Sequence, residues 1–493
     1  MRAAVTVDPH QTTRRGFLGA SATAAATAAL GAPDSAFGAD RPNVILIVVD
    51  SLRADHVYGD RARTPNMDAL VREGIRFTRA HPEAMPTVPV RNTLMSGRRY
   101  FPFRGWHDWR GLLDSPGWAP MTGVSASLPA ALRRAGYWTA YVTDNPFVGF
   151  SVPYRPLRRN FNRFVRTGGQ IGGKRGGVSE HELRHWLLPT LGRDAKVRNR
   201  MRKYLSNGHY AHDEMHSFAA RVFTDATRVL ETAARQRPFA MVVDTYEPHE
   251  PWTPPRKYIN LYGDPDYRGP EPGQPRYGRI EDYFHGDDPA RMLARVRALY
   301  AAEVTMTDRW LGVFLDRLHD LRLERETAIV LVADHGFLLG EYGFTGKISS
   351  ELHPPLMRVP FVVVHPDRKR AGARSEYLAQ THDVAPTLLS LAGVRTPRAM
   401  TGADLSPLFA GRRPRPRTMA YGGYANAMYA RTARWKFISD NRGRNRRLYD
   451  LKHDPDETNN LAHRDPGRAA AMYDAVVRRA GGRPPYYPDS RGA

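Results

Sequence analysis

The sequence predicts an α/β fold in layers, with a mostly parallel central sheet covered by helices. Four short runs are apolar on both faces, as strands in the middle of a parallel sheet are: residues 44–49, 239–243, 328–333 and 361–364. Helical stretches separate these runs, at residues 65–73, 216–235 and 292–318. Strands that alternate with helices favour this fold class, in which ligands bind at the carboxyl ends of the strands.

The first 39 residues are typical of an export signal. Arg14 and Arg15 precede the apolar pair Phe17 and Leu18, and residues 19–32 are Ala-rich and uncharged. Small residues around 36–39 provide a cleavage site. We therefore interpret residues 1–39 as a twin-arginine signal peptide, and we expect an extracellular or cell-envelope protein. No later segment approaches the roughly 18 continuous apolar residues of a membrane span, so we expect no transmembrane segment in the mature protein.

The mature chain divides into a catalytic domain at 40–405 and a C-terminal subdomain at 406–493. A Pro- and Arg-rich run at 407–416 marks the boundary, and apolar segments at 435–438 and 447–451 predict a small terminal sheet. Within the first domain, residues 155–203 carry fourteen Lys or Arg against three Asp or Glu. This basic insertion is either a lid or a plain exposed loop.

Two features of the composition limit which partners and which kinds of site the protein can have. The formal charge of +23 favours anionic partners, although a surface rich in solvated Arg would give the same number. The chain contains no Cys, which excludes disulfides, thiolate metal sites and cysteine nucleophiles.

Residues at two strand ends predict a metal site. Asp50 follows the first apolar run, and Asp334 and His335 follow the third. An adjacent Asp and His at a strand end can both reach one divalent cation. Taken alone, an Asp in such a place is more often a loop cap.

Three further segments predict an anion site. Thr87 lies four residues before Arg91 at the start of a helix, where free N–H groups and a guanidinium suit sulfate or phosphate oxygens. His249 lies between two prolines after the second run, in position to donate to a substrate oxygen, although a surface histidine would look the same. Lys347 follows Asp334 closely enough to meet the same anion.

The order and spacing of these segments resemble the sulfatase family of the alkaline-phosphatase superfamily over nearly the whole mature chain. The matching stretches are residues 41–50, 64–70, 74–77, 87–97, 383–393 and 448–461. The resemblance implies the layered alkaline-phosphatase-like fold. It also implies that Asp50, Asp334 and His335 bind metal, with Thr87 at the nucleophile position completing the site. By the same resemblance, Arg91 is the partner of the nucleophile. His249 and Lys347 are the residues that contact the substrate anion.

The nucleophile position departs from the family pattern. Sulfatases oxidise a Cys or Ser to formylglycine, and a Thr cannot give that aldehyde, so we expect no formylglycine at Thr87. A formylglycine hydrate has a second hydroxyl that expels sulfate, whereas a threonine ester must be hydrolysed at its central atom. That reaction suits phosphorus better than sulfur.

Three other positions depart as well. Ser51 follows Asp50 where the family often has a second Asp, and His335 stands where it often has Asn. Fewer carboxylates and an imidazole favour Mn²⁺ or Zn²⁺ for the one divalent ion, with Ca²⁺ as the alternative. Residues 143–146 read Thr-Asp-Asn-Pro where sulfatases often have a Lys and a His that bind sulfate.

These observations predict an exported, metal-dependent hydrolase of sulfuric or phosphoric (di)esters with a Thr nucleophile. The expected partner is an anionic ester, with a polymeric substrate left open, and no nucleic acid. One alternative is a phosphoryl-group transferase acting on envelope polymers or lipids, although such relatives usually carry transmembrane helices. Another is an inactive relative that binds polyanions through its basic surface. The sequence leaves the oligomeric state and the organic part of the substrate open.

Overall fold

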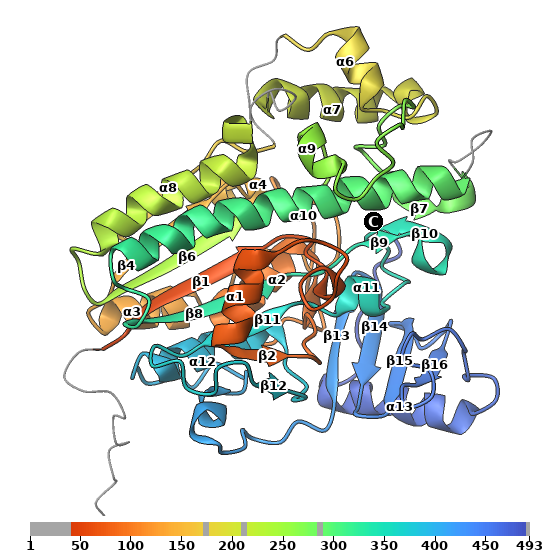
Figure 1. Ribbon diagram of the computed structural model, residues 1–493. Helices are drawn as coiled ribbons and strands as arrows, with labels where there is room; N and C mark the ends of the chain where they lie inside the picture. The colour runs from red at the N-terminus through yellow and green to blue at the C-terminus, as the bar shows by residue number, and fades with distance from the viewer. Residues whose placement is uncertain (1–40, 171–176, 209–213, 283–288, 490–493) are drawn as a thin grey trace, which may run out of the picture. The chain divides into compact units, whose positions relative to one another are not determined.

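The computed structural model of the chain is built on an eight-stranded sheet in the order β12-β2-β11-β8-β1-β6-β4-β5 (Figure 1). It describes residues 41–170, 177–208, 214–282 and 289–489, so the predicted signal peptide lies outside the described residues. The strands are β1 Asn43–Val49, β2 Ile75–Phe77, β4 Trp138–Thr143, β5 Arg163–Arg166, β6 Phe239–Thr245, β8 Thr327–Ala333, β11 Phe361–Val364 and β12 Arg374–Ser375.

The middle of this sheet is parallel. Strands β8, β1, β6, β4 and β5 run the same way, whereas β11 is antiparallel to both β8 and β2. Every residue of β1, β6 and β8 is buried, as their continuous apolar runs predict. Because Val49 of β1 aligns with Thr245 of β6 and Ala333 of β8, the carboxyl ends of the three strands meet at one edge.

Helices cover both faces of the sheet (Figure 1). Helices α1, α8 and α10 pack together on one face, and α2, α3 and α12 pack together on the other. The expected helices at 65–73, 216–235 and 292–318 correspond to α1, α8 and α10. The helices are α1 Pro65–Glu73, α2 Thr87–Ser96, α3 Leu128–Arg134, α4 Pro146–Phe150, α5 Arg155–Arg158, α6 Glu180–His185, α7 Ala195–Gly208, α8 Phe218–Ala233, α9 Arg256–Ile259, α10 Pro289–Asp320, α11 Pro354–Met357, α12 Val384–Leu391 and α13 Pro466–Arg479.

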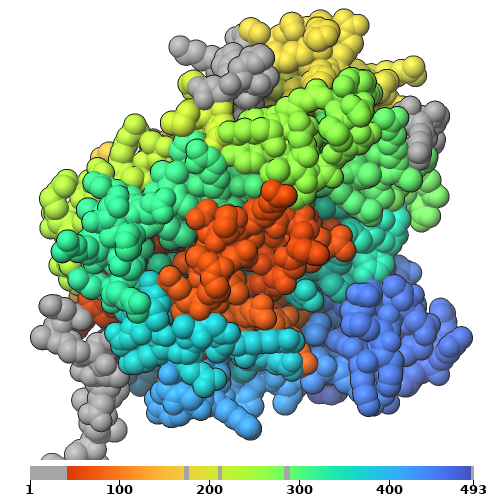
Figure 2. Space-filling model, viewed as in Figure 1, coloured from red at the N-terminus to blue at the C-terminus, as the bar shows by residue number. Residues whose placement is uncertain are grey.

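The C-terminal residues form a second, five-stranded sheet against which α13 packs, and Figure 2 shows them in blue beside the cyan part of the chain. Its strands, in order, are β16 Arg447–Asp450, β15 Trp435–Asp440, β14 Ala427–Arg431, β13 Ala420–Tyr424 and β3 Ala84–Met85. Strand β3 comes from the N-terminal half of the chain and leads directly into α2. Gly422 permits this pairing, because a Cβ there would lie 1.8 Å from the carbonyl oxygen of Glu83.

The basic segment 155–203 has two structural parts. Its first residues form α5 and β5, which is the edge strand of the central sheet. Its later described residues form α6 and most of α7.

A third, small sheet joins β7 Gly278–Arg279, β10 Phe344–Gly346 and β9 Leu338–Leu339. No helix in the described parts of the chain is long and apolar enough to cross a membrane.

Candidate active site

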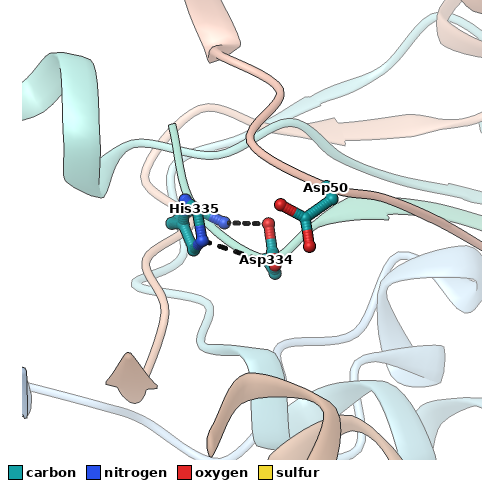
Figure 3. A group of neighbouring side chains, drawn as sticks. All are labelled: Asp50, Asp334 and His335. Carbon is teal, nitrogen blue, oxygen red and sulfur yellow. Dashed lines mark hydrogen bonds and ion pairs between the residues drawn. The ribbon is translucent and has the colours of Figure 1, made fainter. Parts of the chain in front are cut away.

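The three predicted metal ligands lie together at the edge where β1 and β8 end (Figure 3). Asp50 follows β1, and Asp334 and His335 follow β8, its parallel neighbour. All three side chains are fully buried, and their ligand atoms lie within 4.8 Å of one another. The backbone N–H groups of Ser51 and His335 both donate to Asp334 Oδ1, at 2.9 and 2.7 Å, which fixes that carboxylate.

Ser51 adopts a left-handed backbone conformation, with φ 58°. Such a conformation costs a non-glycine residue free energy, and it persists only where the surroundings enforce it. Here it accompanies the hydrogen bond from the Ser51 N–H to Asp334 that links the ends of β1 and β8. Because the donor is a backbone N–H, this contact does not depend on the side chain at position 51.

Two buried atoms of this group form no hydrogen bond with the described residues, namely Asp50 Oδ2, which has an ion pair with Arg91 Nη2 at 3.0 Å, and His335 Nε2. His335 Nδ1 lies 2.9 Å from the carbonyl oxygen of Gly336 and donates to it, so its Nε2 carries a lone pair. A buried acceptor such as His335 Nε2 is costly unless a cation or a donor meets it. Two carboxylate oxygens and an imidazole nitrogen fit a divalent ion of the Mn²⁺ or Zn²⁺ type.

The pKa values of the cluster agree with a site for a cation. Burial and the charge of Asp334 raise the pKa of Asp50 well above its usual value. Burial acts on Asp334 in the same direction, but His335 and Arg91 outweigh it and lower the pKa of Asp334. Burial also lowers the pKa of His335 to about 4, which keeps the imidazole neutral and able to bind metal.

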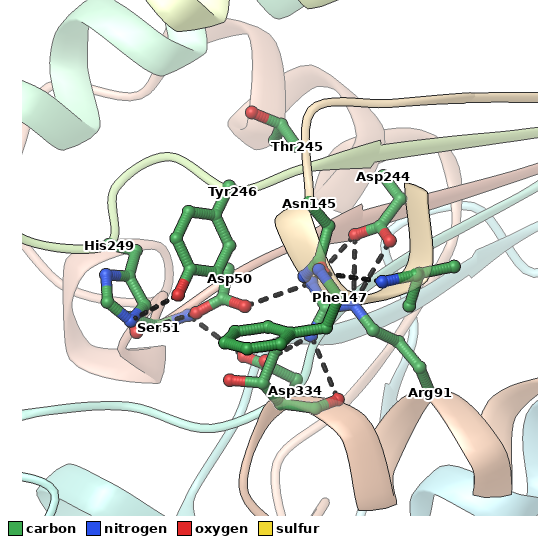
Figure 4. A network of polar contacts seen from close by, with 12 residues as sticks. Asp50, Ser51, Arg91, Asn145, Phe147, Asp244, Thr245, Tyr246, His249 and Asp334 are labelled. Carbon is green, nitrogen blue, oxygen red and sulfur yellow. Dashed lines mark hydrogen bonds and ion pairs between the residues drawn. The ribbon is translucent and has the colours of Figure 1, made fainter. Parts of the chain in front are cut away.

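Arg91 connects this group to the start of α2. Its side chain is fully buried, and its guanidinium contacts Asp244 at 2.7 Å, Asp334 at 2.6 Å and Asp50 at 3.0 Å (Figure 4). Its Nη1 also donates to the backbone oxygen of Thr87 at 3.2 Å. The donors of Arg91 are thus used on carboxylates, and a contact between Arg91 and a substrate anion stays a prediction. We call Asp50, Arg91, Asp244, Asp334 and His335 the charged cluster.

A second group of side chains lies in the loops after β6 and β10. His249 Nδ1 lies 2.7 Å from the carbonyl oxygen of Glu250 and donates to it, so His249 Nε2 is an acceptor. The Tyr246 hydroxyl and Lys347 Nζ, each 2.9 Å away, are its donors. Lys347 also contacts the buried carboxylate of Glu250 at 3.3 Å. We call Tyr246, His249, Glu250 and Lys347 the substrate wall.

The charge of the substrate wall is carried by Lys347 and Glu250. Burial lowers the pKa of His249 to about 3, so this imidazole is neutral near pH 7. Burial opposes ionisation of Glu250, but His249 and Lys347 outweigh it and lower the pKa of Glu250 to about 2. In this arrangement His249 is a hydrogen-bond acceptor, and the groups that can donate to a substrate oxygen are Lys347 and Tyr246.

Thr87, His249, Glu250 and Lys347 line one cavity of about 560 Å³. Thr87 is the first residue of α2 and is 2% exposed, so its side chain lies at the inner surface of this cavity. The first turn of a helix has N–H groups without helical partners, which suit an anion. The structure therefore brings the predicted nucleophile and both predicted substrate contacts to one cavity.

Tyr246, Glu250 and Asp244 belong to the site but were not predicted from the sequence. Asp244 carried the same signal as Asp50 and Asp334, since it follows an apolar run. Glu250 adjoins the predicted site residue His249, and Tyr246 lies three residues before His249.

The unusual segment at 143–146 has structural contacts. Asp144 Oδ1 accepts a hydrogen bond from the Tyr246 N–H at 2.7 Å, and the Asn145 side chain caps α4. Burial raises the pKa of Asp144 to about 7. Asp144 thus fixes the backbone of Tyr246, a residue of the substrate wall, whereas Asn145 stabilises the start of α4.

A family model described as Sulfatase matches residues 42–394. The chain belongs to the sulfatase family. A second model, described as "N-sulphoglucosamine sulphohydrolase, C-terminal", matches residues 340–474.

The relatives of this sulfatase-family chain include a choline-sulfatase and a multifunctional protein of the alkaline phosphatase superfamily. Choline-sulfatase of Rhizobium meliloti (strain 1021) is 27% identical over 455 residues, covering 87% of this chain and 83% of the relative. The multifunctional alkaline phosphatase superfamily protein PehA of Trinickia caryophylli is 27% identical over 418 residues, covering 76% and 78%.

Solved structures share the fold. The phosphonate monoester hydrolase of Agrobacterium radiobacter has a TM-score of 0.65 at 21% identity, covering 90% of this chain and 96% of its own. The comparisons confirm the predicted family, the α/β fold and the class of enzyme, a sulfatase-superfamily ester hydrolase. The roles of the individual site residues stay predictions.

Proposed function

We propose that this sulfatase-family enzyme hydrolyses sulfuric or phosphoric (di)esters through Thr87 and prefers esters of phosphorus. The observation that carries the proposal is the single cavity that Thr87 shares with Lys347 and His249. The donor set of Asp50, Asp334 and His335 would hold one divalent ion, with Thr87 completing the site. Such an ion supplies Lewis-acid activation of a hydroxyl and neutralises charge on an anionic ester.

In the first step the Thr87 oxygen forms a bond to the central atom of the ester, and the bond from that atom to the leaving oxygen breaks. Thr87 loses its hydroxyl proton, and the leaving alkoxide takes up a proton to depart as an alcohol. Lys347 and Tyr246 are the donors of the substrate wall, and they stabilise charge on the ester oxygens by giving them the hydrogen bonds that His249 Nε2 accepts at rest.

In the second step water attacks the same central atom and releases Thr87. The hydroxyl proton returns to Thr87, and the product leaves as the acid anion. This resolution proceeds readily at phosphorus and poorly at a sulfate ester, because a threonine ester has no second hydroxyl with which to expel sulfate. The side chain at position 87 therefore supports a preference for phosphorus.

The test compares variants of Thr87 in the metal-loaded mature protein. Thr87→Ala removes the nucleophile, so we expect kcat to fall on the order of 10³-fold or more, whereas Thr87→Ser should keep much of the rate. Mass spectrometry of the acid-quenched native enzyme should show a phosphorylated peptide at Thr87 and no formylglycine. A native enzyme that hydrolyses aryl sulfates faster than matched phosphodiesters would contradict the preference. Full activity of Thr87→Ala would contradict the nucleophile.

Thr87→Cys adds a second arm to this test. In cells that contain a formylglycine-generating enzyme, the introduced Cys can be converted within the family signature. Only the converted protein should turn over sulfate esters faster than phosphodiesters.

We also propose that the enzyme is exported by the twin-arginine route to the cell envelope or the medium. The proposal rests on Arg14, Arg15 and the Ala-rich stretch that follows them. Replacing both arginines with Lys should leave the precursor in the cytoplasm, as fractionation and immunoblotting would show. Unchanged export of that variant would refute the route.

A further inference from the structure

The cavity that contains Thr87 is much larger than a sulfate or phosphate group needs. Beyond the substrate wall it is lined mainly by apolar and aromatic side chains, of which Leu112, Leu113, Trp118, Phe147, Tyr277 and Tyr424 are the main ones. They come from the loop at 101–123, from α4, from the segment before β7 and from β13. If the ester reacts at Thr87, which is 2% exposed, these residues would surround the organic part of the substrate.

Tyr277 and Tyr424 of this lining present mainly the carbon atoms of their rings to a ligand, because their hydroxyls already donate hydrogen bonds to protein acceptors. The Tyr277 hydroxyl donates to Glu250, and the Tyr424 hydroxyl donates to the backbone oxygen of Lys347 at 3.3 Å. Trp118 and Phe147 pack edge to face, with ring centroids 4.7 Å apart.

The apolar lining continues to the surface. Leu113 is 48% exposed, one of the few large apolar side chains so exposed in the described parts of the chain. An exposed leucine at the mouth of a cavity is stabilised when a ligand covers it. The apolar surface therefore extends from the reacting centre to solvent along one side.

Few polar groups of the cavity are free to bind a ligand. Ser115 Oγ is buried, lines the cavity and has no hydrogen-bond partner among the described residues. Gln170 donates to the backbone oxygen of His249 at 2.8 Å. Of the two charged residues farther from the substrate wall, Arg200 is exposed and Asp114 is half-buried, and their charges are opposite. A sugar carries several hydroxyls, each of which is costly to bury without a partner.

We propose that this cavity takes an ester whose organic part is an apolar aryl or alkyl group, with one hydrogen-bonding substituent within reach of Ser115, and not a polyhydroxylated sugar. The inference rests on the proposed function, since it takes Thr87 as the reacting end of the cavity. It names the substrate class that the proposed function leaves open.

The test measures binding, so it does not depend on turnover. Calorimetry on the metal-loaded protein would compare alkylphosphonates from methyl to hexyl, phenylphosphonate and a sugar phosphonate. Each added methylene should tighten binding about threefold to fourfold until the cavity is filled. Phenylphosphonate should bind more tightly than the sugar phosphonate. A flat series, or tighter binding of the sugar, would overturn the proposal.

A matched pair of surface leucines tests the place of binding. Leu113→Ser should reduce the gain per methylene for the longer chains, whereas Leu261→Ser, at a 38% exposed leucine outside the cavity lining, should leave it unchanged. Both sites are exposed, so neither variant should unfold the protein. Equal effects of the two changes would overturn the proposal.

A third comparison separates an apolar ligand from a cationic one, since aromatic walls also bind quaternary ammonium groups. The phosphonate analogue with a 3,3-dimethylbutyl group should bind at least as tightly as its trimethylammonium isostere. Tighter binding of the cation would overturn the proposal. If the chain-length trend holds but no ester is hydrolysed, the proposed function fails and the assignment of the cavity stands.

Discussion

The charged cluster and the substrate wall lie near one another but balance their charges differently. In the charged cluster, Arg91 is the one permanent cation among three buried carboxylates, Asp50, Asp244 and Asp334. In the substrate wall, Lys347 is paired with Glu250. The cluster therefore has an excess of negative charge that a divalent ion would offset. The wall is close to neutral before substrate binds.

This difference separates two tasks. A metal site needs donors whose negative charge is not already compensated, because the site must bind the cation more favourably than water does. A substrate wall with a free ammonium would bind any anion, and Glu250 reduces that attraction. We expect changes in the cluster to abolish activity or stability, and changes in the wall to tune affinity.

The largest expected effect comes from Asp334→Asn. This change removes one ligand charge while keeping the shape of the side chain, so bound metal should be lost and activity should fall on the order of 10³-fold or more. Elemental analysis and kcat/KM would be measured together. Asp474→Asn, at an exposed aspartate on α13, is the control. A folded Asp334→Asn protein with full metal content would show that the cluster does not bind the ion.

The next effect is on stability. Arg91→Met leaves three buried carboxylates without their shared cation, which should cost about 3–5 kcal/mol of unfolding free energy in the metal-free protein. Excess Mn²⁺ or Zn²⁺ should recover part of that loss by supplying positive charge in the same place. Denaturant unfolding with and without metal would measure both. A variant as stable as the native protein would mean that Arg91 does not hold the cluster together.

The smallest expected effect comes from a change in the substrate wall. Glu250→Gln removes the negative charge beside Lys347 but keeps a polar side chain, so KM for an anionic ester should fall by up to about tenfold. The inhibition constant Ki of inorganic phosphate should fall with it. Glu376→Gln, at an exposed glutamate, serves as the comparison. A rise in KM would instead make Glu250 a substrate contact.

The cluster was far easier to predict from sequence than the wall. Asp50 and Asp334 follow apolar runs, and the parallel sheet brings such strand ends together. Asp244 had the same signal and was overlooked. The direction of β11 was not predictable, because an apolar run indicates that a strand is buried but not whether it runs parallel or antiparallel to its neighbours. The contacts of Tyr246 and Glu250 depend on loop conformations, and the apolar lining at Leu113 and Trp118 depends on how a long loop packs against residues far away in the chain.

The pairing of β3 with β13 has a consequence for the synthesis of this enzyme. The strand that ends just before Thr87 gains its neighbour, Gly423–Tyr424, only when most of the chain has left the ribosome. Tyr424 of the same strand also completes the cavity. A nascent chain that lacks this strand therefore contains Thr87, the proposed nucleophile, but does not hold it in its final position. The enzyme should stay inactive until the last part of its chain has folded onto the first, and a truncation after residue 405 should yield no active fragment.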